Sequence, residues 1–508
     1  MTPRKQITMQ RRAKQDAKKH SAASKKSGKH NSGTNQDAEK LISKNEKRQG
    51  TTSVVPQQRP NKGRALAPEG SFSSTSFENR PIIKSQLVEI DKPIYGGAFL
   101  ARIEGKAVFV PLTLPGEQAL VRVTQSKPGY STAEAEQIVR AAPERIAPAC
   151  PYFAACGGCH YQHTDYATQL AFKQAILRET LERAGVAAPS EISVLSGNPW
   201  AYRNRIRLAF DAMGNPGYRG RRSNTVIPIK ECPIAAPLLV EAALAVGETL
   251  RQLSWALSPN EISFFCNSDE TALLASAFTT HAEKGRFADW AHTLAERIPA
   301  LQGVELIAQR PLGKQMQTVG TWGWGTGSLT YRAAGFDYRV DLGAFFQVNR
   351  WLVDDLVEQV TANHSGNLAW DLFAGVGLFA RQLTSNFASV VAVESAPSAS
   401  EALAHNLSGT SCIPISAETL TFLRRNRTGE RPGLIIVDPP RTGLGAETCT
   451  LLGEIATPAF VYVSCDPATL ARDLRALIGS GYQIQSITLA DLFPQTFHLE
   501  TVVQLRRA

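Results

Sequence analysis

The chain of 508 residues is long enough for about three domains. Hydrophobic residues make up 43% of it, which supports a sizeable core, but the lack of any run of about 18 apolar residues argues against a membrane-spanning helix. The net charge of +10 comes entirely from residues 1–80, so the charge of the remaining chain does not mark it as a nucleic-acid binder.

Residues 1–80 hold 18 Lys and Arg against 6 Asp and Glu, and they are rich in Ser, Gln, Asn and Gly. This composition predicts a disordered tail. The tail serves either to keep the protein soluble or to attract phosphates in a salt-dependent way. It lacks the apolar segment of a secretory signal, and eight cysteines in so long a chain do not suggest a disulfide scaffold. We therefore expect a cytoplasmic monomer that does not associate with membranes.

Residues 81–147 contain short apolar segments separated by turn residues such as Gly96-Gly97 and Pro115-Gly116. Closely spaced strands of this kind predict a small β-barrel. At the edge of a larger enzyme such a barrel is either an RNA-binding module of the OB type or a purely structural domain.

Residues 148–345 form the predicted central α+β domain. It contains a cysteine cluster, a helix near residues 169–184 and a basic strand at residues 202–207. Alternate residues of a strand share one face, so the arginines of this strand form either a phosphate-contacting face or a solvated edge. The arginines are Arg203, Arg205 and Arg207.

The cysteine cluster has the spacing C-x5-C-G-G-C, with one more cysteine far downstream. Four thiolates can bind either Zn²⁺ or a [4Fe–4S] cluster. The candidate ligands are Cys150, Cys156, Cys159 and Cys232.

Residues 346–508 form the last predicted domain. From about Leu368, apolar strands alternate with helical segments, which predicts a doubly wound α/β sheet. The strand at residues 368–373 leads into a glycine-rich turn that contains Gly375, where the backbone can approach a ligand. Glu394 ends the next strand, 23 residues after Asp371, where a carboxylate can bind ribose hydroxyls.

A dinucleotide would also fit this pattern, but the third glycine of its fingerprint is replaced by Ala380. The later motifs suit S-adenosylmethionine. Asp438 begins an Asp-Pro-Pro turn after the strand at residues 434–437, and Glu418 follows the strand before it. Enzymes that methylate exocyclic amines usually place an aromatic residue after these prolines, whereas this chain has Arg441.

Cys465 follows the strand at residues 460–463 and precedes a helix whose N-terminus can favour a thiolate. A lone cysteine is by default a small buried apolar residue, but its position and neighbours favour a nucleophile. Glu500 lies in the closing segment and can serve as the base that methylation at C5 of a pyrimidine needs. His498 either orients this segment or is an ordinary surface or core histidine.

Together these motifs resemble the RNA uracil-C5 methyltransferases, which make 5-methyluridine, over about residues 83–508. The matching segments are residues 346–349 (FQVN), 371–377 (DLFAGVG), 438–441 (DPPR), 462–473 (YVSCDPATLARD) and 493–500. The resemblance implies a class I, Rossmann-like methyltransferase domain, with Cys465 as nucleophile and Glu500 as base. The residues assigned to S-adenosylmethionine are Gln347, Phe373, Gly375, Leu378, Glu394, Glu418 and Asp438.

The chain departs from the family pattern at three positions. Leu378 stands where some members have Asn, so a side-chain hydrogen bond to the cofactor is lost. Ala374 replaces a frequent Cys, which we expect to be harmless, and the family varies at the position of Glu418.

The cysteine spacing resembles the iron–sulfur members of the family, and residues 83–140 resemble the TRAM domain. These features imply a [4Fe–4S] cluster and 23S ribosomal RNA as substrate, with transfer RNA as the alternative. Phe345 either stacks on a flipped base or packs in the core. A non-catalytic RNA-binding assembly protein is a further alternative, but it predicts loss of Cys465, the base or the glycine turn, and all three are present.

Overall fold

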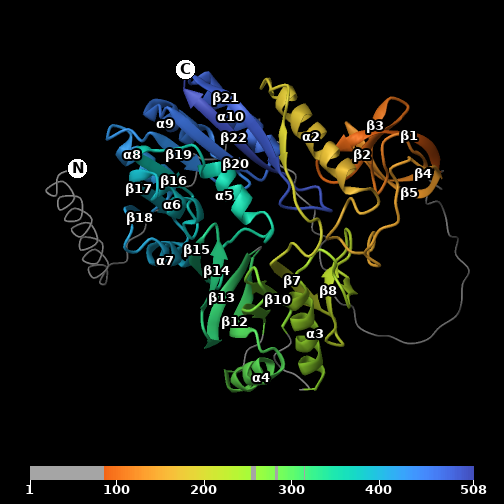
Figure 1. Cartoon of the computed structure of the whole chain (residues 1–508). Helices are drawn as coiled ribbons and strands as arrows, with labels where there is room; N and C mark the ends of the chain where they lie inside the picture. The colour runs from red at the N-terminus through yellow and green to blue at the C-terminus, as the bar shows by residue number, and fades with distance from the viewer. Residues whose placement is uncertain (1–84, 253–258, 281–283, 314, 508) are drawn as a thin grey trace, which may run out of the picture. The chain divides into compact units, whose positions relative to one another are not determined.

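The computed structural model describes residues 85–252, 259–280, 284–313 and 315–507 (Figure 1). The predicted disordered tail at residues 1–80 lies outside these ranges. Within the described ranges, no helix has both the length and the apolar character needed to cross a bilayer.

Five strands close into the predicted barrel, drawn in orange in Figure 1. They are β1 (Gln86–Ile94), β2 (Ala98–Ile103), β3 (Lys106–Pro111), β4 (Gln118–Ser126) and β5 (Tyr130–Arg140). The barrel closes because β4 pairs with β1 and β5 pairs with β3. Along β1, buried Val88 and Ile90 alternate with exposed Leu87 and Glu89, as one buried face of a strand requires.

The central region contains a seven-stranded sheet with two helices. Its elements are β7 (Arg205–Phe210), β8 (Pro216–Arg219), β9 (Val226–Pro228), α3 (Pro237–Gln252), β10 (Glu261–Cys266), β11 (Leu273–Thr279), α4 (Lys284–Arg297), β12 (Leu301–Leu312) and β13 (Gln315–Gly325). The strand order is β13-β12-β11-β10-β7-β8-β9. Trp290 of α4 is buried in the core that the sheet shares with α3.

The C-terminal region contains an eight-stranded sheet covered by helices. Its elements are α5 (Val353–Thr361), β16 (Gly366–Leu372), α6 (Leu378–Leu383), β17 (Phe387–Glu394), α7 (Pro397–Asn406), β18 (Cys412–Ser416), α8 (Thr419–Asn426), β19 (Leu434–Val437), α9 (Ala446–Ile455), β20 (Ala459–Ser464), α10 (Pro467–Gly479), β21 (Tyr482–Ala490) and β22 (Glu500–Arg507).

The strand order of this sheet is β18-β17-β16-β19-β20-β22-β21-β6, with β6 formed by Ser193–Leu195. Strands β16 to β20 are parallel, and β22 runs antiparallel to β20. The chain order reverses between β16 and β19, and the crevice at such a switch point is where α/β sheets bind ligands. This fold confirms the predicted doubly wound α/β domain.

Four elements from the predicted central region pack with the C-terminal sheet. Strand β6 pairs with β21, and helix α2 (Tyr166–Arg183) contributes Leu177 and Leu181 to the same core as α10. The hairpin of β14 (Ser328–Ala333) and β15 (Phe336–Asp341) packs on the other side of the sheet. Packing is therefore continuous across residue 345, where the sequence pattern changes.

Candidate active site

The turn after β16 forms the floor of the crevice. Phe373, Gly375 and Gly377 have positive φ angles of 64°, 55° and 93°, a region that glycine enters without steric strain. A Cβ atom built on Gly375 would have no heavy atom within 4 Å. The backbone at Gly375 therefore faces open space that a ligand can occupy.

Glu394, at the end of β17, holds this turn in place. Its Oε2 accepts a hydrogen bond of 2.9 Å from the backbone N–H of Gly375. Its Oε1 accepts bonds of 2.7 Å from the N–H groups of Ser395 and Ala396. The structure thus places Phe373, Gly375 and Glu394 at one edge of the sheet, as the sequence predicts.

Asp371 has a structural role that the sequence analysis missed. Its Oδ2 accepts a bond of 2.8 Å from the N–H of Ala380, while its buried Oδ1 has no partner among the described residues. Burial, together with the nearby carboxylates of Asp438 and Glu394, raises the pKa of Asp371 to about 8. The available signal was its place as an acidic residue next to the end of the mainly apolar strand β16.

Three other predicted cofactor residues lie outside the turn after β16. Leu378 begins α6 with its side chain in the core, and its carbonyl accepts a bond from Tyr338. Glu418 is exposed at the start of α8. Gln347 lies outside the sheet, and its carbonyl accepts a bond of 2.8 Å from Asn204.

Cys465 lies between β20 and α10, partly buried. Asp466 caps the helix by accepting bonds from the N–H groups of Ala468 and Thr469. Burial, followed by the negative fields of Glu500 and Asp438, raises the pKa of the Cys465 thiol to about 12. The expectation that the helix N-terminus favours a resting thiolate is therefore wrong, because the Asp466 carboxylate already occupies the free N–H groups and two further carboxylates oppose a second anion.

Glu500 begins β22 with its side chain buried. Burial and the Asp438 carboxylate raise its pKa well above the usual value, and the Arg441 guanidinium opposes that shift. Burial also raises the pKa of Asp438 to about 7. Arg441 donates a hydrogen bond of 3.2 Å to Nδ1 of His498. A thiol, two carboxyl groups and one cation thus share the carboxyl end of the sheet.

The segment before Glu500 is held by helix α2. The Nζ atom of Lys173, fully buried, donates to Oδ1 of Asp491 at 2.5 Å and to the carbonyl of Phe493 at 2.9 Å. Tyr166 donates to the same carboxylate at 2.9 Å. The sequence analysis missed Lys173, since only the tertiary fold brings residues 173 and 491 together.

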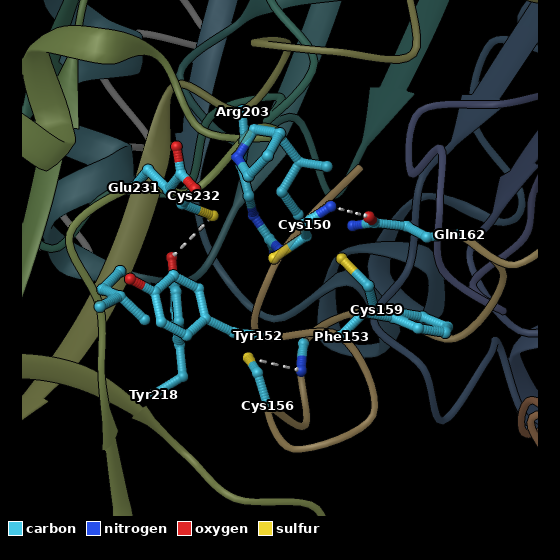
Figure 2. Close-up of a pocket in the computed structure, with 14 residues that line it drawn as sticks. Cys150, Tyr152, Phe153, Cys156, Cys159, Gln162, Arg203, Tyr218, Glu231 and Cys232 are labelled. Carbon is cyan, nitrogen blue, oxygen red and sulfur yellow. Dashed lines mark hydrogen bonds between the residues drawn. The ribbon is translucent and has the colours of Figure 1, made fainter. Parts of the chain in front are cut away.

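The four cysteines of the predicted cluster line one cavity (Figure 2). Its volume is about 40 Å³, which is larger than the space that a single water molecule needs. The Cys156 thiol accepts a bond of 3.4 Å from the N–H of Gly158, and the Cys232 sulfur lies 3.8 Å from the Tyr218 hydroxyl. Burial raises the pKa of Cys156 to about 11 and that of Cys159 to about 12.

The cysteines share this cavity without forming a coordination shell. Over residues 85–507, apart from the short undescribed stretches, no three His, Cys, Asp or Glu side chains are arranged to hold a metal ion. The metal-ligand geometry expected for Cys150, Cys156, Cys159 and Cys232 is therefore not present. The Nε atom of Arg203, which also lines the cavity, is buried and has no hydrogen-bond partner in the described chain.

The basic strand has its own intramolecular partners. The guanidinium of Arg205 lies 4.2 Å from the ring centroid of Phe265, and that of Arg207 lies 4.3 Å from that of Phe278. Arg207 also pairs with Glu261 at 2.7 Å. Phe345, by contrast, is 60% exposed, so it does not pack in the core.

Comparison with known proteins identifies two matching family models. One, described as tRNA (Uracil-5-)-methyltransferase, matches residues 290–508. The other, the TRAM domain, matches residues 83–135, which cover most of the barrel.

Two of the relatives that match most of the chain illustrate the similarity. The 23S rRNA (uracil(1939)-C(5))-methyltransferase RlmD of an Azoarcus species is 34% identical over 456 residues, which cover 81% of this chain and 97% of that protein. An uncharacterized RNA methyltransferase of Streptomyces avermitilis is 33% identical over 449 residues, which cover 83% of this chain and 98% of that protein.

Among solved structures, the tRNA (uracil-54, C5)-methyltransferase of Pyrococcus abyssi in complex with S-adenosyl-L-homocysteine has a similar fold. It superposes with a TM-score of 0.66 at 23% identity and covers 83% of this chain and all of that one.

Proposed function

The chain belongs to the RNA uracil-C5 methyltransferase family, and we propose that it methylates C5 of uracil in 23S ribosomal RNA by way of a covalent enzyme–RNA intermediate. The observation that carries the proposal is the position of Cys465 and Glu500. They lie after the end of β20 and at the start of β22, two paired antiparallel strands, and they interact electrostatically at the edge of the sheet. Relatives at 32% and 34% identity are 23S rRNA enzymes, which supports ribosomal rather than transfer RNA.

The residues of the crevice suit S-adenosylmethionine, which supplies an electrophilic methyl group when bound. Gly375 faces open space, and the Glu394 carboxylate lies beside it. We assign the cofactor to Gln347, Phe373, Gly375, Leu378, Glu394, Glu418 and Asp438.

In the proposed reaction, Cys465 and Glu500 first give their protons to solvent, and the Cys465 thiolate then forms a bond to C6 of uracil. This addition makes C5 nucleophilic, and bound S-adenosylmethionine would supply the methyl group that C5 takes, its sulfur–methyl bond breaking to leave a neutral sulfide. Glu500 then accepts the C5 proton, the C5–C6 double bond reforms and the sulfur–C6 bond breaks. The thiolate is regenerated, and Glu500 passes its proton to solvent.

The raised pKa values fit this order of events. With its thiol protonated at rest, the enzyme keeps Cys465 unreactive until a substrate binds. A buried Glu500 with a raised pKa is a stronger base than an exposed carboxylate, and such tuning is common where a carboxylate must accept a proton.

We also propose that Cys150, Cys156, Cys159 and Cys232 hold a [4Fe–4S] cluster. Their common cavity, the softness of four thiolates and the unpartnered Nε donor of Arg203 support this assignment. The methyl transfer moves no net electrons, so the cluster's role would be structural.

The central test is methyl transfer from labelled S-adenosylmethionine to unmodified 23S rRNA and to unmodified transfer RNA, followed by nucleoside analysis. We expect 5-methyluridine in rRNA only. The Cys465→Ala variant should lower turnover by roughly 10⁴-fold or more, with RNA binding retained. A 5-methylcytidine product or a methylated amine would refute the function, and an active Cys465→Ala variant would refute the covalent mechanism.

A further inference from the structure

A second cleft lies outside the methylation crevice, at the junction of the barrel and the central region. Its volume is about 510 Å³. One wall is the β1–β2 turn with Gly96 and Gly97. Another is the loop that carries Cys156 and Cys159, with Gly157 and His160. The third wall is the β8–β9 turn, which carries Arg221 and Arg222.

The two arginines of this turn lack the carboxylate partner that the neighbouring Arg219 has. Arg219 pairs with Glu261 at 2.8 Å, whereas in the described chain neither Arg221 nor Arg222 forms an ion pair. The Nη1 atom of Arg221 is buried and has no hydrogen-bond partner in the described residues. Glu134 of the barrel is the acidic group that faces Arg221, and Arg222 is the nearby cation. A buried donor without a partner is unfavourable, so Arg221 calls for a ligand that accepts hydrogen bonds.

A series of side-chain contacts, two of them between aromatic rings, connects the cleft to the candidate active site. Gly97 packs so closely on His160 that a Cβ atom there would lie 2.7 Å from the imidazole ring. The His160 ring lies 4.7 Å from the ring of Phe497, which in turn lies 5.5 Å from that of Tyr95. The Tyr95 hydroxyl donates to Asp466 at 3.4 Å, next to Cys465.

We propose that this cleft binds the sugar–phosphate backbone of the RNA strand next to the uracil that is methylated. Guanidinium groups bind phosphate oxygens with paired, charge-assisted hydrogen bonds, and walls of glycine allow a backbone to approach closely. The arginines of strand β7 already stack on Phe265 and Phe278, so the β8–β9 turn offers the more available cations. The inference rests on the proposed function, because it takes RNA as the ligand.

The test compares RNA binding by the wild-type chain and by a variant with Arg221→Gln and Arg222→Gln. The probe is a short labelled single-stranded oligouridylate, titrated by fluorescence anisotropy at several salt concentrations. We expect Kd to rise roughly 10- to 100-fold at low salt, the loss typical of charged hydrogen bonds. The slope of log Kd against log salt should fall by about 1.4, since each single-strand phosphate contact contributes about 0.7.

Three further variants separate the cleft from other effects. Arg424→Gln with Arg425→Gln removes the same charge from the exposed face of α8 and should bind like the wild type. Arg222→Gln alone changes an exposed side chain and should give part of the loss without harming the fold. Arg221→Lys with Arg222→Lys keeps the charge and should keep most of the salt slope.

Unchanged affinity and salt slope in the double Gln variant would overturn the cleft proposal, and so would an equal loss in the α8 control. The methylation assay on the wild type stands apart from this result. If the wild type binds RNA through the cleft but makes no 5-methyluridine, the proposed function fails and the cleft stands.

Discussion

The candidate active site and the cysteine cavity both contain buried thiols with raised pKa values, yet their neighbours differ. Cys465 faces Glu500, Asp438 and the cation Arg441. The cysteines of the cavity face mainly one another, and Cys232 raises the pKa of both Cys150 and Cys156. Burial is common to both regions, so burial alone does not decide what a thiol does.

The difference lies in where a proton can go when a thiol ionises. At the active site a single anion forms beside groups that exchange protons, and Arg441 offsets part of the charge. In the cavity, several anions would repel one another in a region of low polarity, which is unfavourable without a bound cation. The first arrangement suits proton transfer, and the second suits metal binding.

After Cys465→Ala, the largest effect is expected from Glu500→Gln, which removes the proton acceptor but leaves Cys465 in place. The rate should fall by about 10²- to 10⁴-fold, the usual contribution of a general base. The covalent enzyme–RNA adduct should accumulate, since elimination needs that base. Denaturing gel electrophoresis with labelled RNA would detect it. If the Glu500→Gln variant turns over like the wild type, Glu500 is not the proton acceptor, and the contrast between the active site and the cysteine cavity fails.

The next effect concerns the ion pair that anchors the segment before Glu500. Lys173→Met leaves Asp491 buried without its cation and should lower the free energy of unfolding by about 3–5 kcal/mol. Denaturant unfolding would measure the change. The control is Lys92→Met, because Lys92 pairs with Glu179 at 2.7 Å on a partly exposed surface and exposed pairs contribute about 0–1 kcal/mol. Equal losses in the two variants would contradict the role of burial.

A metal in the cysteine cavity is tested by Cys156→Ser in protein purified without oxygen. We expect the wild type to contain iron and sulfide with visible absorbance, and the variant to lose most of both, because one of four ligands is missing. Cys412→Ser changes a buried cysteine of strand β18 and should leave the iron content unchanged. Zinc in place of iron would refute the cluster, and a metal-free wild type would refute any metal site.

The smallest effect is expected from Arg441→Gln. Arg441 lowers the pKa of both Cys465 and Glu500, so its removal should raise both further. At neutral pH less thiolate would then form, and kcat/KM should fall severalfold and recover as the pH rises. A pH–rate profile would measure this alkaline shift, and Arg441→Lys should largely restore the wild-type profile. If the pH dependence of kcat/KM in Arg441→Gln is the same as in the wild type, Arg441 does not lower the pKa of Cys465.

Much of the candidate active site could be predicted because its residues follow strand ends. Glu394, Asp438 and Cys465 each end or follow a parallel strand, and the carboxyl ends of parallel strands meet at one edge of the sheet. Short-range patterns are enough for such positions. They are not enough for Lys173 or Tyr95, whose partners lie 318 and 371 residues away in the chain.

The sequence by itself determined the class of fold, the residues at the strand ends and the family. Apolar periodicity and local motifs are sufficient for these, because both are patterns over short stretches of the chain. Only the tertiary structure decided the protonation of Cys465, since that depends on burial and on carboxylates brought in from β19 and β22. It also decided that the four cysteines share one cavity, that helix α2 holds Asp491 in the segment before Glu500, and that Tyr95 of the β1–β2 turn reaches Asp466. These features depend on contacts between distant segments, and no local pattern encodes them.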